Sequence, residues 1–251
     1  MSMPLSGKTA LITGSTSGIG RAIADLLAER GAHVIVSGRN AERGAQAVAD
    51  IREAGGKADF VQADLTSADS ARALAEQARS VTGQIDILVN NAAVFPEGAT
   101  TDTTEEVFDA VYNTNVKAPF FLVAELVPAM VERGAGAVVN VSSFAADKAA
   151  PDRAAYSSSK AALNNLTKAW AKEYGPSGVR VNAVAPGPVV PEEVQAVIAG
   201  DPRVAAVTDA LPARRFGLPR EIAEAVAYLA SDAAAFAHGA FLSIDGGAGL
   251  A

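Results

Sequence analysis

The chain has no cysteine among its 251 residues and only two histidines, His33 and His238. Without a thiol there is no disulfide, no thiolate metal site and no cysteine nucleophile. The two histidines lie far apart in the sequence, and neither has a carboxylate at metal-ligand spacing. These absences disfavour a metal centre and a histidine-based catalytic triad, so other side chains must carry any chemistry.

Positive charge and long apolar runs are also scarce. The formal net charge of −7 argues against a surface that follows phosphate backbones, so nucleic acid is not an expected partner. The longest apolar run, Ala118 to Val127, is too short to span a bilayer and contains Glu125, so no membrane association is expected. The N-terminus shows no signal-peptide pattern, because Lys8 to Thr13 already has the composition of a strand. We therefore expect a cytoplasmic protein.

Short β-branched runs alternate with longer segments of helical periodicity. The expected strands are Thr9–Thr13, His33–Ser37, Asp59–Gln62, Ile85–Asn90, Ala137–Ser142, Val179–Ala185 and Phe241–Ile244. The expected helices are Ile19–Arg30, Ala41–Ala54, Ser70–Val81, Thr104–Arg133, Ala155–Tyr174 and Pro219–Ser231. This alternation predicts an α/β fold: one domain over residues 1–251, with a doubly wound, Rossmann-type parallel sheet of about seven strands between two helical layers.

One segment departs from this alternation. After Pro186-Gly187, an insert at about 187–218 is rich in valine and interrupted by prolines. Long excursions at the carboxyl edge of a sheet are often lids, so we predict a substrate lid here. An ordinary packed helical insert is the alternative.

A glycine-rich turn follows the first expected strand. Glycines allow a tight turn and a close approach of the backbone to a pyrophosphate at a helix N-terminus. The spacing G-x-x-x-G-x-G differs from the common fingerprint G-x-G-x-x-G, and a plain structural turn is the alternative. We predict that a nucleotide contacts Gly14, Ser15, Thr16, Ser17, Gly18 and Ile19.

The ends of the next strands indicate which nucleotide binds. Gly38 occupies the position where an acidic residue would hold the 2′-hydroxyl of NAD(H), whereas the flanking Ser37 and Arg39 suit a 2′-phosphate. NADP(H) is therefore preferred, with NAD(H) possible and a merely solvated Arg39 as the alternative. Asp64, Leu65 and Asn91 close the third and fourth strands, where they are placed to contact the adenine and a ribose or to stabilise local turns.

Tyr156 and Lys160 are four residues apart in an expected helix, so both side chains leave the same face. An ammonium beside a phenol favours the phenolate, which predicts a lowered pKa and a proton donor. The spacing alone is common on half-buried helices. Its context is more informative, because a strand that ends in the hydroxyls of Ser142 and Ser143 comes directly before it.

Pro119 removes a helical hydrogen-bond donor from the expected helix Thr104–Arg133. The carbonyl of Asn115, four residues earlier, consequently loses its partner. This carbonyl is free either to hold a water near Lys160 or to face solvent at a simple kink.

These motifs together resemble the short-chain dehydrogenase/reductase family in its shorter single-domain form. The resemblance covers essentially the whole chain, including Pro186-Gly187 and Asp245-Gly246-Gly247, and the general pattern is most similar to 3-oxoacyl-carrier-protein reductases. It implies that Tyr156 is the acid, Ser143 holds the substrate oxygen, Lys160 binds the nicotinamide ribose and Asn115 positions a relay water. It also implies that Tyr156, Lys160 and the backbone of Val189 contact the cofactor.

Two positions depart from the family pattern. Ala93 stands where the family usually has glycine, which is tolerated if the local backbone is not left-handed. Pro188-Val189-Val190-Pro191 lacks the threonine that commonly holds the carboxamide, so we expect weaker or differently ordered lid closure.

The sequence therefore predicts an NADP(H)-dependent oxidoreductase that acts on a carbonyl or secondary alcohol, with a 3-oxoacyl thioester or another hydrophobic ketone as substrate. The alternatives are an NAD-dependent sugar or polyol dehydrogenase and a non-catalytic nucleotide-binding sensor. Family members commonly pair long helices such as Thr104–Arg133 and Ala155–Tyr174 between subunits, which implies a homotetramer or homodimer.

Overall fold

Seven strands form one parallel sheet in the computed structural model, which describes residues 3–148, 151–198 and 200–250. Their bounds are β1 Thr9–Ile12, β2 His33–Gly38, β3 Lys57–Gln62, β4 Ile87–Asn90, β5 Gly136–Val141, β6 Val179–Pro186 and β7 Phe241–Ile244. The spatial order is β3-β2-β1-β4-β5-β6-β7, which confirms the predicted fold class. The strand order runs outward in one direction from β1 to β3 and in the other direction from β4 to β7. Open α/β sheets bind ligands at such a switch point, beyond the carboxyl ends of the strands.

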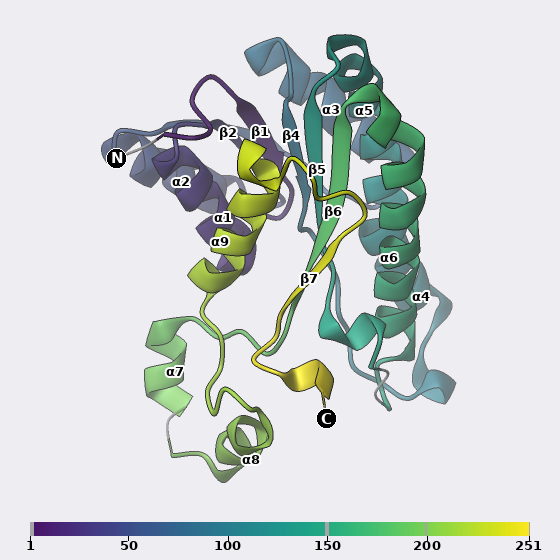
Figure 1. Cartoon of the computed structure of the whole chain (residues 1–251). Helices are drawn as coiled ribbons and strands as arrows, with labels where there is room; N and C mark the ends of the chain where they lie inside the picture. Colours follow the sequence, from purple (N-terminus) through teal and green to yellow (C-terminus); the bar gives the residue numbers. More distant parts are fainter. Residues whose placement is uncertain (1–2, 149–150, 199, 251) are drawn as a thin grey trace.

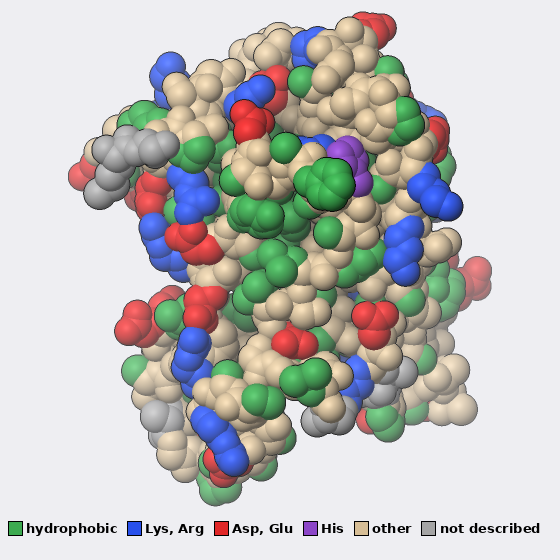
Figure 2. All heavy atoms as spheres, viewed as in Figure 1, with side chains coloured by type: hydrophobic (Ala, Val, Ile, Leu, Met, Phe, Trp, Pro, Cys, Tyr) green, Lys and Arg blue, Asp and Glu red, His purple; other side chains and the backbone are tan. Residues whose placement is uncertain are grey.

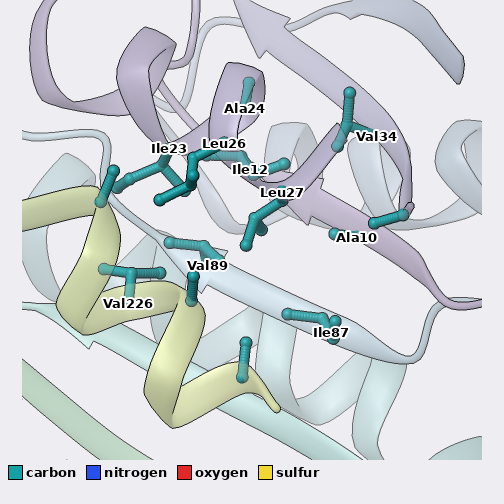
Figure 3. Packing of buried hydrophobic residues seen from close by; sticks show 14 of the residues in the cluster. Ala10, Ile12, Ile23, Ala24, Leu26, Leu27, Val34, Ile87, Val89 and Val226 are labelled. Atoms are coloured by element: carbon teal, nitrogen blue, oxygen red, sulfur yellow. The ribbon is translucent and has the colours of Figure 1, made fainter. Parts of the chain in front are cut away.

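Helices cover both faces of this sheet (Figure 1). One layer contains α1 Gly18–Glu29, α2 Ala41–Glu53 and α9 Pro219–Ala230, and the other contains α3 Ala68–Thr82, α5 Ala118–Arg133 and α6 Ala154–Tyr174. Successive strand residues serve opposite layers: Ile12 belongs to the first core cluster and Leu11 to the second. Side chains of α1 and α9 meet over β1 and β4 (Figure 3). This two-sided burial explains the near-continuous apolar strands.

The helix predicted over Thr104–Arg133 is formed as a continuous helical run with a π turn inside it. It consists of α4 Glu105–Tyr112, a π turn over Asn113–Lys117, and α5. The turn ends two residues before Pro119, the second residue of α5, whose missing N–H disturbs the regular helical ladder. The run Glu105–Arg133 is long and apolar enough to cross a membrane by length and composition alone. Its apolar face is explained by packing, because Leu122 and Leu126 are buried in the second core cluster.

The insert predicted at 187–218 contains two short helices, α7 Glu192–Ile198 and α8 Pro202–Ala210. They lie beyond the carboxyl edge of the sheet, apart from the two covering layers (Figure 1). The ends of the insert are joined, since Val190 N donates to Gly217 O and Gly217 N donates to Pro188 O, both at 3.0 Å. The segment is therefore a helical excursion anchored at its base, and its role as a lid stays a prediction.

Candidate active site

The turn after β1 favours glycine at three positions, either through a positive φ angle or through lack of space for a Cβ. Gly14 and Gly18 have φ angles of +64° and +56°. A Cβ on Gly20 would lie 2.3 Å from the Gly14 carbonyl oxygen and 2.4 Å from Asn91 Nδ2. The turn consequently keeps its backbone exposed to a ligand, while the start of α1 packs closely beneath it.

Thr13 and Asn91 join the carboxyl ends of β1 and β4. The Thr13 hydroxyl accepts hydrogen bonds from the backbone N–H groups of Asn91 and Ala92, both at 3.0 Å. Asn91 Nδ2 in turn donates to the carbonyls of Thr13 at 2.9 Å and Gly14 at 3.1 Å. Thr13 was not among the predicted site residues, although a hydroxyl at the end of a buried strand is a signal that sequence reasoning can use.

A cavity of about 540 Å³ opens above this turn. The predicted nucleotide contacts that line it are Gly14, Thr16, Ser17, Gly18, Ile19, Ser37, Arg39, Asp64, Leu65 and Asn91. Ser15 differs from the expectation, because it is fully buried and does not line this cavity. Its Oγ donates to the Ile12 carbonyl at 2.7 Å and accepts from Ser37 N at 3.0 Å. Ser15 therefore supports the turn from below.

Two arginines border the same cavity. Arg39 follows β2, and Arg43 lies in the first turn of α2, where its backbone N–H donates to Asn40 Oδ1 at 2.8 Å. Both side chains are exposed. The sequence interpretation missed Arg43, which the start of α2 brings to the same cavity as Arg39. The glycine-rich turn and the cavity above it together fit a dinucleotide, and the two arginines border that cavity.

A second cavity of about 560 Å³ adjoins the first. The two share Ile19, Asn91, Ala93 and Phe95 as lining residues. The second cavity is also lined by four predicted site residues: Ser143, Tyr156, Lys160 and Val189. The structure therefore brings the predicted catalytic hydroxyl, phenol and ammonium to one wall, next to the nucleotide cavity.

Lys160 is the most deeply buried charged side chain of this wall, with 2 % of its surface exposed. Its ammonium donates to the Val141 carbonyl at 2.8 Å and lies 5.8 Å from the centroid of the Tyr156 ring. Burial lowers the pKa of Lys160 to about 8.

Burial raises the pKa of Tyr156, and a hydrogen bond with Ser143 and the charge of Arg153 offset only part of that effect. The expectation that Lys160 brings the Tyr156 pKa towards neutrality is therefore wrong for this structure. Burial destabilises the charged phenolate more than the hydrogen bond with Ser143 and the charge of Arg153 stabilise it. Tyr156 consequently stays protonated at neutral pH, the state that a proton donor requires.

Asn115 lies in the π turn, fully buried and outside both cavities. Its amide is bonded to both backbone groups of Val94: Nδ2 donates to the carbonyl and Oδ1 accepts from the N–H, each at 2.9 Å. Nδ2 also donates to Ser159 Oγ at 3.0 Å. Asn115 thus fixes the loop after β4 against α6. Its predicted role in holding a water through its main-chain carbonyl stays a prediction.

Two further lining residues were not predicted. The ring of Phe95 lies 5.7 Å from that of Tyr156, and Arg153 lines the catalytic cavity while forming an ion pair with Glu97. Nothing in the local sequence distinguishes either residue from an ordinary loop residue. The backbone at Ala93 is not left-handed, which is the condition under which alanine is expected to be tolerated there, since Asp152 and Arg214 are the only non-glycine residues with positive φ in the described ranges.

Comparisons with known proteins agree with this geometry. The family described as Enoyl-(acyl carrier protein) reductase matches residues 14–249. Human dehydrogenase/reductase SDR family member 4 is 40 % identical over 245 residues, covering 97 % of this chain and 88 % of that protein. The 3-oxoacyl-[acyl-carrier-protein] reductase of Thermotoga maritima is 37 % identical over 245 residues, covering 98 % and 99 %. A solved gluconate 5-dehydrogenase from Burkholderia cenocepacia, in complex with NADP and tartrate, has a TM-score of 0.91 at 32 % identity and covers 99 % and 98 %.

Proposed function

Because the chain belongs to the short-chain dehydrogenase/reductase family of oxidoreductases, we propose that it is an NADP(H)-dependent enzyme that reduces a hydrophobic ketone or oxidises the matching secondary alcohol. One observation carries this proposal: Ser143, Tyr156 and Lys160 share a cavity wall beside a cavity that fits a dinucleotide. A 3-oxoacyl thioester is one ketone of the proposed class, supported by the relative from Thermotoga maritima.

The proposed mechanism follows from a protonated Tyr156 and a cationic Lys160 on the same side of the catalytic cavity. NADPH, when bound, supplies a hydride to the carbonyl carbon. Tyr156 gives its phenolic proton to the carbonyl oxygen, so that the C=O double bond becomes an alcohol. Ser143 donates a hydrogen bond to the same oxygen as negative charge develops there. Lys160 stabilises the phenolate left on Tyr156, which then recovers a proton from solvent.

The walls of the catalytic cavity support a hydrophobic substrate. Phe95, Phe144, Val190 and Val207 line it with apolar surface, and the insert contributes the two valines. The segment Pro188–Pro191 offers no side-chain hydroxyl towards a carboxamide. Shape and apolar contact are therefore proposed to hold the substrate against Tyr156.

The test is a panel of aliphatic ketones assayed with NADPH for the native protein and for Tyr156→Phe. Loss of a general acid lowers the rate about 100-fold or more, whereas NADPH affinity is expected to persist. Unchanged turnover in Tyr156→Phe would refute the assignment. NADPH binding without turnover of any ketone or sugar would instead favour the nucleotide-binding sensor.

The cofactor preference has a separate test. Arg39→Asp is expected to lower the preference for NADPH over NADH at least about tenfold, because a carboxylate repels the 2′-phosphate and accepts a hydrogen bond from a 2′-hydroxyl. Arg43→Ser is expected to cause a smaller shift in the same direction. If neither variant alters the ratio of NADPH and NADH affinities, the arginines do not bind the phosphate, and the NAD-dependent sugar or polyol dehydrogenase becomes the better reading.

We also propose a homotetramer or homodimer in the cytoplasm. Phe108 on α4 and Phe120 on α5 are 45 % and 44 % exposed, which supports pairing through these helices. Hydrophobic side chains also gather over α9 and the edge strand β7 (Figure 2), where Tyr228 is 45 % exposed. Light scattering of the purified protein tests the assembly, and cell fractionation tests the location.

A further inference from the structure

The catalytic cavity has an uneven charge distribution. Its described lining contains two cationic side chains, Arg153 and Lys160, and no aspartate or glutamate. Lys160 is buried and its ammonium already donates to the Val141 carbonyl, so we assign its charge to the catalytic residues around Tyr156. The side chain of Arg153 is 37 % exposed, so it is the more accessible of the two cations.

Arg153 is held in place by two contacts between neighbouring loops. Its Nη2 donates to Glu97 Oε1, and the adjacent backbone is bonded through Gly98 N to the Asp152 carbonyl at 2.8 Å. The hydrogen bond to Glu97 uses one of five guanidinium donors, which leaves most of the fork for an anionic ligand. An arginine fixed in this way loses little conformational entropy when it binds a second carboxylate.

Arg153 also lies close to the reacting group. It is the residue directly before α6, three positions ahead of Tyr156, and both residues line the catalytic cavity. Burial raises the pKa of Tyr156, and the charge of Arg153 offsets part of that rise, which places the guanidinium within electrostatic reach of the phenol. The ring of Phe95 packs beside Tyr156 and lines the same cavity as Arg153, so this cavity also offers apolar surface.

We infer that Arg153 selects substrates bearing a carboxylate, and that the site takes an oxo acid whose apolar body lies between this arginine and Tyr156. The inference rests on the proposed function and narrows its substrate class. The ketone oxygen meets Ser143 and Tyr156, the aliphatic chain meets Phe95 and the insert, and the carboxylate meets the guanidinium. Glu97 competes with the substrate for Arg153, which keeps the cation in position when no acid is bound.

The experiment compares levulinate and its longer homologues with their methyl esters, using NADPH and reporting the acid-to-ester ratio of kcat/KM. Arg153→Gln is expected to lower this ratio at least about tenfold, as loss of a charge-assisted hydrogen bond predicts. Arg153→Lys is expected to lower it less, because a point charge replaces the fork. Glu97→Gln is expected to raise the ratio about twofold or more by removing the competitor.

Arg220→Gln is the matched control. Arg220 is also an exposed arginine at a helix start, paired with Glu29, but it does not line the catalytic cavity. Its removal changes net charge by the same amount, and the ratio is expected to stay within about twofold of the native value. A tenfold fall in Arg153→Gln without one in Arg220→Gln supports the inference.

A ratio that is unchanged in Arg153→Gln overturns the inference, because a purely structural Arg153–Glu97 pair would affect acids and esters alike. The inference is also overturned if the native protein reduces the esters but not the acids, a result that leaves the proposed function intact. Binding of NADPH with reduction of neither class overturns the inference, and the panel of aliphatic ketones then decides separately whether the proposed function holds. If Arg153→Gln does not fold, the opposite shifts expected for Arg153→Lys and Glu97→Gln decide the question.

Discussion

The two sides of the active site differ in how their positions are fixed. The site floor, defined as the turn Thr13–Gly20 with Asn115, Ser143, Tyr156 and Lys160, grows from strand ends and from helices buried in both core clusters. Asn115 is 0 % and Lys160 2 % exposed. In the insert 187–218, by contrast, no described residue of α7 or α8 is buried, and Val197 is 83 % exposed.

This difference separates chemistry from selectivity. A change in the floor must be accommodated by packed neighbours, so it costs stability as well as function. A change in the insert alters mainly the surface that a substrate would meet, at little cost to folding. The floor is therefore suited to an invariant proton and hydride transfer, and the insert to different substrates.

The largest effect is expected from Lys160→Met. Turnover should fall about 100-fold or more, because the phenolate on Tyr156 would lose the cation that stabilises it. At pH 7 the free energy of unfolding should nevertheless rise by up to roughly 3 kcal/mol, since a buried ammonium whose pKa is lowered from 10.5 to about 8 opposes folding. Ketone turnover and urea denaturation measure the two changes.

The sign of this stability difference is tested by pH. The pKa of Lys160 is lower in the folded state, so the unfolded chain holds the extra proton between about pH 8 and pH 10.5. The penalty from Lys160 is complete below about pH 8 and is relieved as the pH rises through this window. The gap between Lys160→Met and the native protein should therefore narrow with rising pH, and a gap that widens would contradict the buried-cation interpretation.

A smaller effect is expected from Gly20→Ala. The added Cβ would approach the Gly14 carbonyl to 2.3 Å, so the turn must move, with a loss of about 1–3 kcal/mol in stability and about tenfold or more in NADPH affinity. Gly98→Ala is the control, because no heavy atom lies within 4 Å of its added Cβ. Fluorescence titration with NADPH and thermal denaturation distinguish the two; equal behaviour would mean that the floor is less tightly packed than described.

The smallest effect is expected from Val207→Ser on the insert side. Val207 lines the catalytic cavity and is 43 % exposed, so loss of its apolar surface should lower kcat/KM for aliphatic ketones only a few-fold. Stability should change by less than about 0.5 kcal/mol. Steady-state kinetics beside urea denaturation measure both quantities. A large loss of stability would show that the insert is as constrained as the floor and would remove the contrast between them.

Much of the floor was predictable because it depends on local patterns. The spacing of Tyr156 and Lys160, the glycines after β1 and the hydroxyl of Ser143 at the end of β5 are sequence signals, and the structure brings these residues to adjoining cavities. The insert was less predictable, because α7 and α8 are short, flanked by prolines and supported by few buried contacts. Their sequence therefore carries little helical periodicity to detect.

Alternation of buried strands with amphipathic helices determined the fold class by itself, because each element must bury its apolar face against another layer. The sequence also indicated the nucleotide end and the proton donor through residue types and spacing. Only the tertiary structure decided that Ser15 points inward, that the amide of Asn115 binds Val94, and that Tyr156 has a raised pKa. Those properties depend on desolvation and on partners from distant segments, which local sequence does not specify. The sequence also did not show that Arg153 lines the catalytic cavity, because its position depends on the loop that carries Glu97.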